Sequence, residues 1–266
     1  MQIFKLLVVT CIIMIFIVAC KKSDNKTNDN VTVNIEFNVI TVADSVENYT
    51  NDSTLYNVIK ISYFEAKGDS TQKLFIDNIN EDFFTWLSSF LFTEAQYTVT
   101  KNNINDVVTA EIKKFINDID ADESLIDCES CRNAELAIDA SEFYQTDKIM
   151  SIVYSHYQYS GGAHGYYGIA TFNYSKQTAE PITINNLSAN IDELTTIAEK
   201  AFIRQIGDIK DFWFDGGIFY LPKIFYFTEK GIVFYYSIYE IACYADGAIT
   251  LELEYNQVKN LIKYMK

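Results

Sequence analysis

The chain has 266 residues, of which 49% are hydrophobic and 15% aromatic, so it has enough apolar material to fold and is not a disordered chain. Its formal charge is −15 at pH 7, with 36 acidic against 21 basic residues. This charge disfavours nucleic acid as a partner, because phosphates attract lysine and arginine, and it would attract basic partners instead.

The first 30 residues have the pattern of an export signal followed by a tether. After a positively charged start, an apolar run extends over the 14 residues Leu6–Ala19, and Cys20 follows directly. This order is typical of a bacterial lipoprotein signal peptide, and the run is shorter than the roughly 20 residues that a membrane-spanning helix needs. We expect residues 1–19 to be removed and Cys20 to be lipidated. Residues 20–30 would be a flexible tether that anchors the protein to a membrane of the bacterial cell envelope, facing the periplasm or the exterior.

The next region is predicted to begin with two strands. Apolar and polar residues alternate from Val31 to Val39, which indicates a half-buried strand. Ala43–Thr54 is polar and is predicted to be a loop. A second strand is expected over Val58–Phe64, ending near Gly68.

Two amphipathic helices are predicted after these strands. Apolar residues recur at helical spacing over Lys73–Leu91 and again over Ile104–Ile119. Asn102 or Asn103 is placed to cap the second helix.

Cys128, Cys131 and Cys243 would remain in the mature chain besides the lipidated cysteine. Cys128 and Cys131 are separated by two residues, and there is no second such pair to complete a four-ligand zinc site. We therefore expect a local disulfide or two free thiols, with no metal and no cofactor. The acidic neighbours Asp127 and Glu129 disfavour a redox pair, because negative charge raises the pKa of a thiol.

The remainder is rich in predicted strands. Strands are expected at Leu136–Tyr144, Ile149–Tyr159, Tyr166–Tyr174, Pro181–Ile184, Phe219–Leu221, Ile224–Thr228, Ile232–Ile238 and Ile249–Tyr255. Asn190 is placed to cap a helix that ends near Ile206, and a short final helix is expected over Val258–Tyr264. Strands and helices thus occur in blocks. This favours an α+β fold with antiparallel sheets packed with helices, in two adjacent modules over residues 31–147 and 148–266.

The segment Gly161–Gly165 contains three glycines and one of the two histidines, His164. It is either an exposed loop that meets a ligand or a tight turn whose histidine bonds its own backbone. The other histidine, His156, is expected to lie on a strand, with its ring either packed or facing solvent and not acting as a ligand. The sequence has no nucleophile elbow and no phosphate loop, so we assign no catalytic residue.

Two groups of segments resemble a known family. The first group is Tyr159–Gly165, Phe172–Tyr174 and Ile182–Leu187, and the second is Phe227–Phe234, Tyr239–Ala242 and Tyr244–Gly247. Together they are similar to the extracellular domain family of the lysozyme-sensing anti-sigma factor RsiV, over about Ile149–Ile262. The preceding region is similar to the companion module that RsiV shares with the peptidoglycan deacetylase PdaC.

This resemblance implies a non-catalytic α+β ectodomain that binds a partner, either a basic protein such as lysozyme or cell-wall glycan. The candidate ligand-binding residues are Gly161, Gly162, His164, Gly165, Tyr166, Tyr239 and Tyr244. The alternative hypothesis is an envelope hydrolase that uses His164 with carboxylates or a metal.

Overall fold

The computed structural model describes residues 35–49, 54–92, 97–121, 133–161 and 163–265. These residues divide into two compact units. Unit 1 comprises Asn34–Asp139 and Tyr157–Tyr166, and unit 2 comprises Ala140–His156 and Tyr167–Lys266. Among the described residues, no helix is both long and apolar enough to cross a membrane.

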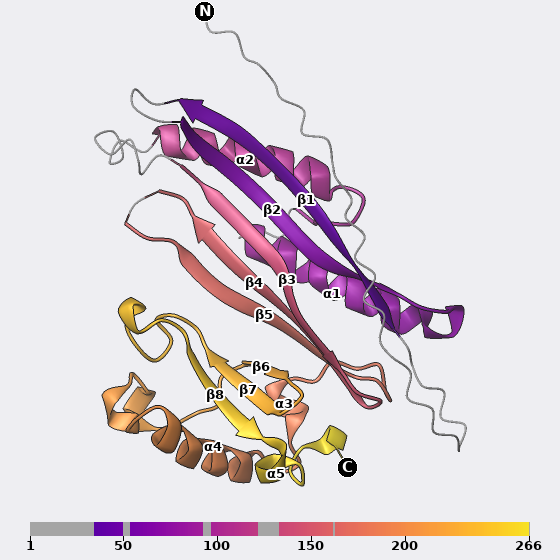
Figure 1. Cartoon of the computed structure of the whole chain (residues 1–266), viewed down its shortest axis with the longest axis vertical. Coiled ribbons are helices and arrows are strands. Elements are labelled where there is room, and N and C mark those ends of the chain that lie inside the picture. Colours follow the sequence, from indigo (N-terminus) through magenta and orange to yellow (C-terminus); the bar gives the residue numbers. More distant parts are fainter. Residues whose placement is uncertain (1–34, 50–53, 93–96, 122–132, 162, 266) are drawn as a thin grey trace, which may run out of the picture. The chain divides into compact units, whose positions relative to one another are not determined.

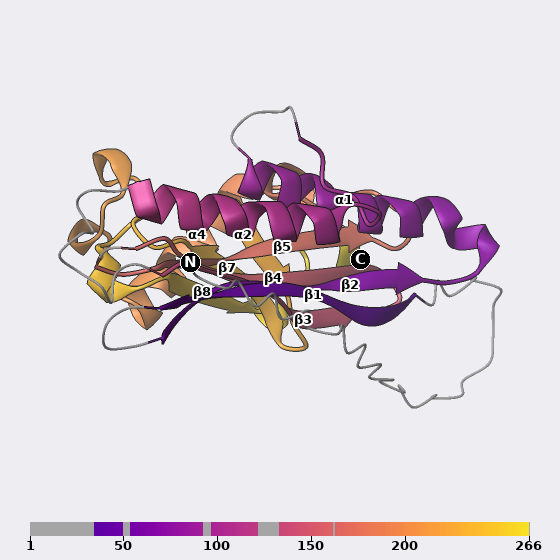
Figure 2. The same cartoon turned by 90° about the horizontal axis from the view of Figure 1, so that it is seen from above.

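Unit 1 begins with a long antiparallel hairpin. Strands β1 (Glu36–Tyr49) and β2 (Thr54–Lys67) pair over their whole length, from Glu36 opposite Lys67 to Tyr49 opposite Thr54. Helices α1 (Lys73–Leu91) and α2 (Ile104–Ala121) lie on one face of this hairpin, as Figure 2 shows. The two predicted helices and the second predicted strand are therefore confirmed.

The prediction of a loop over Ala43–Thr54 is wrong, because β1 continues to Tyr49 and β2 already starts at Thr54. Strand β1 is at the edge of its sheet, so one face and one edge can accept polar residues. Val42 is buried between exposed Thr41 and Ala43, which keeps the alternation of a half-buried strand within a polar sequence.

The apolar side of α1 packs against β2. Its buried residues recur every four positions, at Phe75, Ile79, Phe83 and Leu87. The ring of Phe83 stacks on Tyr63 of β2, with centroids 5.0 Å apart. This burial is the main source of stability for a surface helix.

Asn103 does not cap α2 in the expected way. Its side-chain oxygen instead accepts a hydrogen bond from the backbone N–H of Thr100 at 2.7 Å, and Ile104 N donates to Thr100 O at 3.0 Å. Thr100 therefore starts the turn that leads into the helix, and Asn103 reaches back to it as the third residue of a capping box does.

A five-stranded sheet has the order β1-β2-β3-β4-β5, visible in Figure 1. Its later strands are β3 (Glu135–Gln145), β4 (Ile149–Tyr159) and β5 (Tyr166–Ser175), each within one residue of the prediction. β2 and β3 are parallel, with Val58 opposite Glu135, which corrects the expectation of antiparallel sheets at this pair. Because α1 and α2 connect these two strands, the chain has the long crossover that a parallel pair requires.

Unit 2 contains helix α4 (Ile191–Gln205) and a second, antiparallel sheet in the order β6-β7-β8. The sheet consists of β6 (Ile224–Phe227), β7 (Gly231–Tyr236) and β8 (Ile249–Glu254). The predicted Asn190 cap is confirmed, since its side chain accepts from Glu193 N at 3.2 Å. The α+β class with two helix-packed parts is confirmed as well.

Phe202 of α4 is at the centre of the core of unit 2. Its ring is fully buried and lies between 5.0 and 5.9 Å from four others: Phe212, Phe214, Phe219 and Tyr236. All four of these contacts are edge-to-face, an arrangement that aromatic rings prefer. The core thus fixes the loop over residues 212–220 against the sheet.

Several short predictions for unit 2 need correction. Phe219–Leu221 is not a strand, Pro181 forms only an isolated bridge with Tyr174, and the last helix, α5, covers Tyr255–Val258. The remaining elements are α3 (Ile184–Leu187), η1 (Ser70–Gln72), η4 (Ile209–Asp211), η5 (Asp215–Gly217), η6 (Tyr244–Asp246) and η7 (Lys263–Met265). In the mispredicted segments of unit 2, Ile182, Phe219 and Ile262 are buried in the core although they lie outside the named strands and helices, so their apolar pattern indicated burial and not a regular element.

Candidate functional site

Three tyrosines of unit 2 lie together on its surface and form what we call the tyrosine cluster: Tyr167, Tyr239 and Tyr244. The ring centroid of Tyr244 is 5.6 Å from that of Tyr239 and 6.2 Å from that of Tyr167. Tyr239 is 51% exposed and Tyr167 is 36% exposed. Each ring has an apolar face and a hydroxyl, which suits binding to protein or sugar.

The backbone at Tyr239 holds its side chain outward. Strand β7 ends at Tyr236, and a turn follows in which Glu240 N donates to Ser237 O at 2.9 Å. Tyr239 occupies this turn with φ of +66°, a left-handed conformation that glycine normally supplies. Such strain costs about 1 kcal/mol or more in a non-glycine residue and is concentrated at functional sites.

The backbone at Gly247 makes room for Tyr167. Its φ is +73°, and a Cβ atom added there would lie 2.9 Å from the Tyr167 hydroxyl. Any larger residue would displace this ring from the cluster.

Two carboxylates are close in sequence to the tyrosine cluster: Glu240 follows Tyr239 directly, and Asp246 is two residues after Tyr244. Glu240 accepts hydrogen bonds from Ser237 N at 2.8 Å and from the Tyr220 hydroxyl at 3.4 Å. Burial, with a further contribution from Glu240, raises the pKa of Tyr220. Asp246 accepts from the exposed Cys243 thiol at 2.9 Å. The cluster is therefore an aromatic surface with an acidic margin.

A loop with exposed apolar residues is hydrogen-bonded through its backbone to the segment that follows Tyr239. Trp213 is 57% exposed, and its backbone N–H donates to Ile241 O at 2.8 Å. The loop of Trp213 also carries Ile218, which is 72% exposed. Large exposed apolar side chains on one loop are a feature of interaction surfaces.

The glycine–histidine segment belongs to unit 1 up to Tyr166. His164 and Tyr166 are exposed, and Gly161 has φ of +89°. A Cβ atom at Gly165 would lie 2.5 Å from the ring of Tyr157, so packing alone requires this glycine. The other predicted glycine, Gly162, lies outside the described residues.

Other sequence predictions have separate outcomes. The ring of His156 packs against Gly168, where a Cβ atom would lie 2.9 Å from its Nε2, and burial lowers the His156 pKa to about 4. Of the two expected placements of this ring, packed or facing solvent, the structure has the packed one. Cys20, Cys128 and Cys131 lie outside the described residues. Within the described ranges, no group of three or more His, Cys, Asp or Glu side chains is placed to hold a metal ion.

Of the predicted site residues, Tyr239 and Tyr244 are in direct ring contact. Tyr167 completes their cluster from the start of β5. The sequence placed the Gly161–Tyr167 stretch and the Tyr239–Gly247 segment close to the functional site, although Tyr167 itself was not among the candidate ligand-binding residues.

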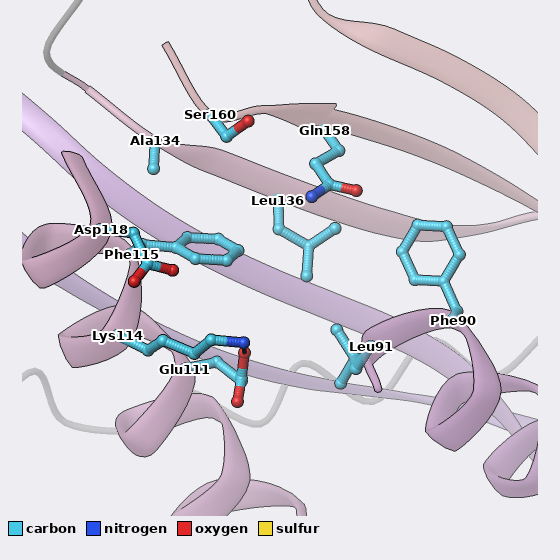
Figure 3. A pocket seen from close by; sticks show the side chains of 10 residues that line it. All are labelled: Phe90, Leu91, Glu111, Lys114, Phe115, Asp118, Ala134, Leu136, Gln158 and Ser160. Atoms are coloured by element: carbon cyan, nitrogen blue, oxygen red, sulfur yellow. Dashed lines mark ion pairs between the residues drawn. The ribbon is translucent and has the colours of Figure 1, made fainter. Parts of the chain in front are cut away.

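Unit 1 contains a pocket of about 320 Å³ that sequence reasoning also missed, shown in Figure 3. Its lining residues come from α1, α2 and the segments of β3 and β4: Phe90, Leu91, Glu111, Lys114, Phe115, Asp118, Ala134, Leu136, Gln158 and Ser160. Glu111 is buried, and burial together with Asp118 raises its pKa, while Lys114 lowers it. A signal existed, because Glu111 follows Val107 and Val108 at helical spacing and so falls on the apolar side of α2.

Comparisons with known proteins match both parts of the chain. The model of a family described as deacetylase PdaC matches residues 24–167, and that of a protein of unknown function, DUF3298, matches residues 181–256. No curated protein matches the chain.

Two solved structures have a similar fold. A DUF3298 family member from Bacteroides fragilis is 17% identical with a TM-score of 0.69, over 88% of this chain and 98% of the other. A DUF3298 family protein from Pseudomonas aeruginosa is 16% identical with a TM-score of 0.54, over 86% and 95% of the two chains. At these identities the likeness shows the fold alone.

Proposed function

The chain belongs to the family described as deacetylase PdaC, whose model covers more than half of it, and we propose that it is a cell-envelope lipoprotein that binds a partner without catalysis. The DUF3298 match to the C-terminal part agrees with the resemblance to the RsiV-like domain pair. The function of the DUF3298 family is unknown, so the proposal depends on the surface of this chain.

The observation that carries the proposal is the conformation of Tyr239. Its backbone has φ of +66°, and its side chain is 51% exposed while it contacts Tyr244. Folding alone gains little from a strained residue whose ring remains largely in water. A contribution to binding explains why tyrosine is present where glycine would fit better.

A basic protein is the partner that this surface fits best. Tyrosine and tryptophan are the residues that most often dominate protein interfaces, and here Tyr239 and Trp213 are both more than half exposed. Glu240 and Asp246 lie at the margin, and the whole chain has a charge of −15. This charge would attract a basic protein such as lysozyme and speed its association. Cell-wall glycan is the other ligand of the proposal.

The membrane anchor is proposed from the sequence. Removal of residues 1–19 and lipidation of Cys20 would attach the protein to the cell envelope by acyl chains. A Cys20→Ala variant tests this directly: it should no longer incorporate a palmitate analogue, and continued incorporation would overturn the anchor.

Calorimetric titration tests the binding function. The mature chain, residues 20–266 with Cys20→Ser so that it carries no lipid, is titrated with lysozyme at low and moderate salt. We expect binding that survives added salt, is lost in Tyr239→Gly, and persists in Tyr56→Ala. Glycine suits the left-handed backbone, so the first variant should stay folded, and Tyr56 is a 53% exposed tyrosine of unit 1.

The remaining outcomes separate the alternatives. Binding that disappears with salt would indicate charge attraction only. Binding to peptidoglycan fragments and not to lysozyme would identify cell-wall glycan as the ligand. No binding to either ligand would overturn the proposal. Release of acetate from N-acetylated glycan, lost in His164→Ala, would favour the hydrolase that uses His164.

A further inference from the structure

We propose that the pocket of unit 1 binds an organic cation, that is, an ammonium or guanidinium group on an apolar stem. The carboxylate of Glu111 would form the ion pair with this cation. Small amines and the side chains of lysine and arginine share this chemistry. The inference concerns a site in unit 1 and does not depend on the tyrosine cluster of unit 2.

Glu111 is the first observation. The residue is 8% exposed, and among the described residues its carboxylate accepts no hydrogen bond. Its ion pair within the described part of the chain is with Lys114, at 3.9 Å between Oε2 and Nζ. This separation is too long for a hydrogen bond, and the Lys114 side chain is 57% exposed to water. Although the residue is mostly buried, neither of its carboxylate oxygens is a fully buried atom without a partner within the described residues, so both remain accessible from the pocket. A cationic ligand in the pocket could therefore reach the carboxylate and offer it charged donors.

The walls of the pocket are the second observation. Figure 3 shows Glu111 and Lys114 at one side, with the ring of Phe115 above them and Leu136, Leu91 and Phe90 further along. These apolar groups can cover a hydrocarbon stem, and the two phenyl rings can attract a cation through their faces. Gln158 and Ser160 offer polar groups on the side of β4. A volume of about 320 Å³ is enough for a small ligand.

The charges facing Glu111 agree with a cationic ligand. From α2 they are Lys114 and Asp118, while the lining residues from α1, β3 and β4 carry no charge. The lining thus carries two negative charges, on Glu111 and Asp118, and one positive charge, on Lys114. Asp118 and Lys114 are exposed at the edge of the pocket. Burial and Asp118 raise the Glu111 pKa. A bound cation would favour the ionised carboxylate, so binding should weaken as the solution is acidified.

The test is a titration of the unlipidated mature chain with n-butylammonium and n-butylguanidinium, followed by NMR shifts of α2 amides. We expect saturable binding of either cation. Glu111→Gln should weaken it at least tenfold, whereas Glu81→Gln, an exposed acid on α1, should change it less than twofold. Neutral n-butanol should not bind measurably.

A second variant guards against a folding defect in the first. Ser160 is exposed at the edge of the pocket, so Ser160→Trp should leave the fold intact and block entry of the ligand. Absence of binding by both cations in the wild-type chain would overturn the proposal. It would also be overturned if folded Glu111→Gln bound as tightly as the wild type.

A lysine-containing peptide distinguishes the two sources of the cation. At least tenfold tighter binding of an acetylated, amidated lysine tripeptide than of n-butylammonium would identify a protein side chain as the ligand. Equal or weaker binding would identify a free amine. Tyr239→Gly should affect neither probe, so failure of this site and failure of the proposed function are separable.

Discussion

Asn173 of β5 donates a hydrogen bond from Nδ2 to the carbonyl of Phe225 in β6 at 2.7 Å. Ser151 of β4 accepts from Phe227 N at 2.9 Å and donates to the Asn173 side-chain oxygen. β6 is the edge strand of its sheet, and these side chains satisfy its outward backbone groups where a further strand would otherwise do so. A short polar network thus joins the two sheets within unit 2.

Removal of this amide should destabilise unit 2. Asn173→Ala leaves Phe225 O and the Ser151 hydroxyl without their buried partner, which should lower the free energy of unfolding by about 2 kcal/mol. Denaturant unfolding of the unlipidated chain measures it. Asn117→Ala, an exposed change on α2, should be neutral or slightly stabilising. A loss at Asn173 no larger than at Asn117 would contradict the role of the network.

Replacement of Tyr239 should show the strain of its backbone. Because φ is +66°, Tyr239→Gly should be more stable than Tyr239→Ala by about 1 kcal/mol. At Tyr56, inside strand β2, the order should reverse, since glycine weakens a strand. The comparison is made by thermal unfolding of the four variants. An alanine variant at position 239 that equals the glycine variant would show that the backbone relaxes.

His156 should make the fold sensitive to acid. Its pKa is lowered from 6.5 to about 4 by burial. Between these two values the unfolded state binds a proton that the folded state does not, so stability falls as the pH drops through this range and is unaffected by His156 above it. Allowing for the partial exposure of the ring, the loss is about 2 kcal/mol.

His156→Phe should remove this component of the pH dependence while keeping a ring against Gly168. Since the chain has two histidines, His164→Gln in the exposed segment is the matched control and should leave the profile unchanged. The readout is the midpoint of urea unfolding as a function of pH. A parallel profile in wild type and His156→Phe would assign the acid sensitivity to other groups.

Much of the fold could be predicted from local patterns. The period of apolar residues placed α1 at Lys73–Leu91, and the Asn190 cap placed the start of α4. These features depend on residues within one or two turns of each other. The parallel pairing of β2 with β3 depends on contacts between residues far apart in sequence, which no local pattern contains.

The candidate sites were harder to predict for the same reason. Tyr239 and Tyr244 were named from the sequence, but Tyr167 joins them only through tertiary contact. Gly165 was predicted to bind a ligand, whereas in the structure the Tyr157 ring leaves no room for a side chain at this position. The pocket needs four elements to assemble, so Glu111 seemed an ordinary helix acid among 36 acidic residues.

Glu111 should lower the stability of the fold at neutral pH although it favours binding of the cation. For a carboxyl with a raised folded-state pKa, folding costs nothing extra in acid, where both states are protonated, and the full penalty applies once the pH exceeds the raised value. Glu111→Gln should therefore stabilise the chain at neutral pH and have little effect below the ordinary carboxyl pKa.

Urea unfolding of Glu111→Gln at neutral and acid pH checks this prediction, with Glu81→Gln as the exposed control that should be neutral at both. A site selected for binding commonly sacrifices stability, so a more stable variant that no longer binds the cation is the expected pair of results. Destabilisation by Glu111→Gln at neutral pH would mean that the carboxylate already has adequate partners in the fold. The buried charge would then need no ligand to explain it.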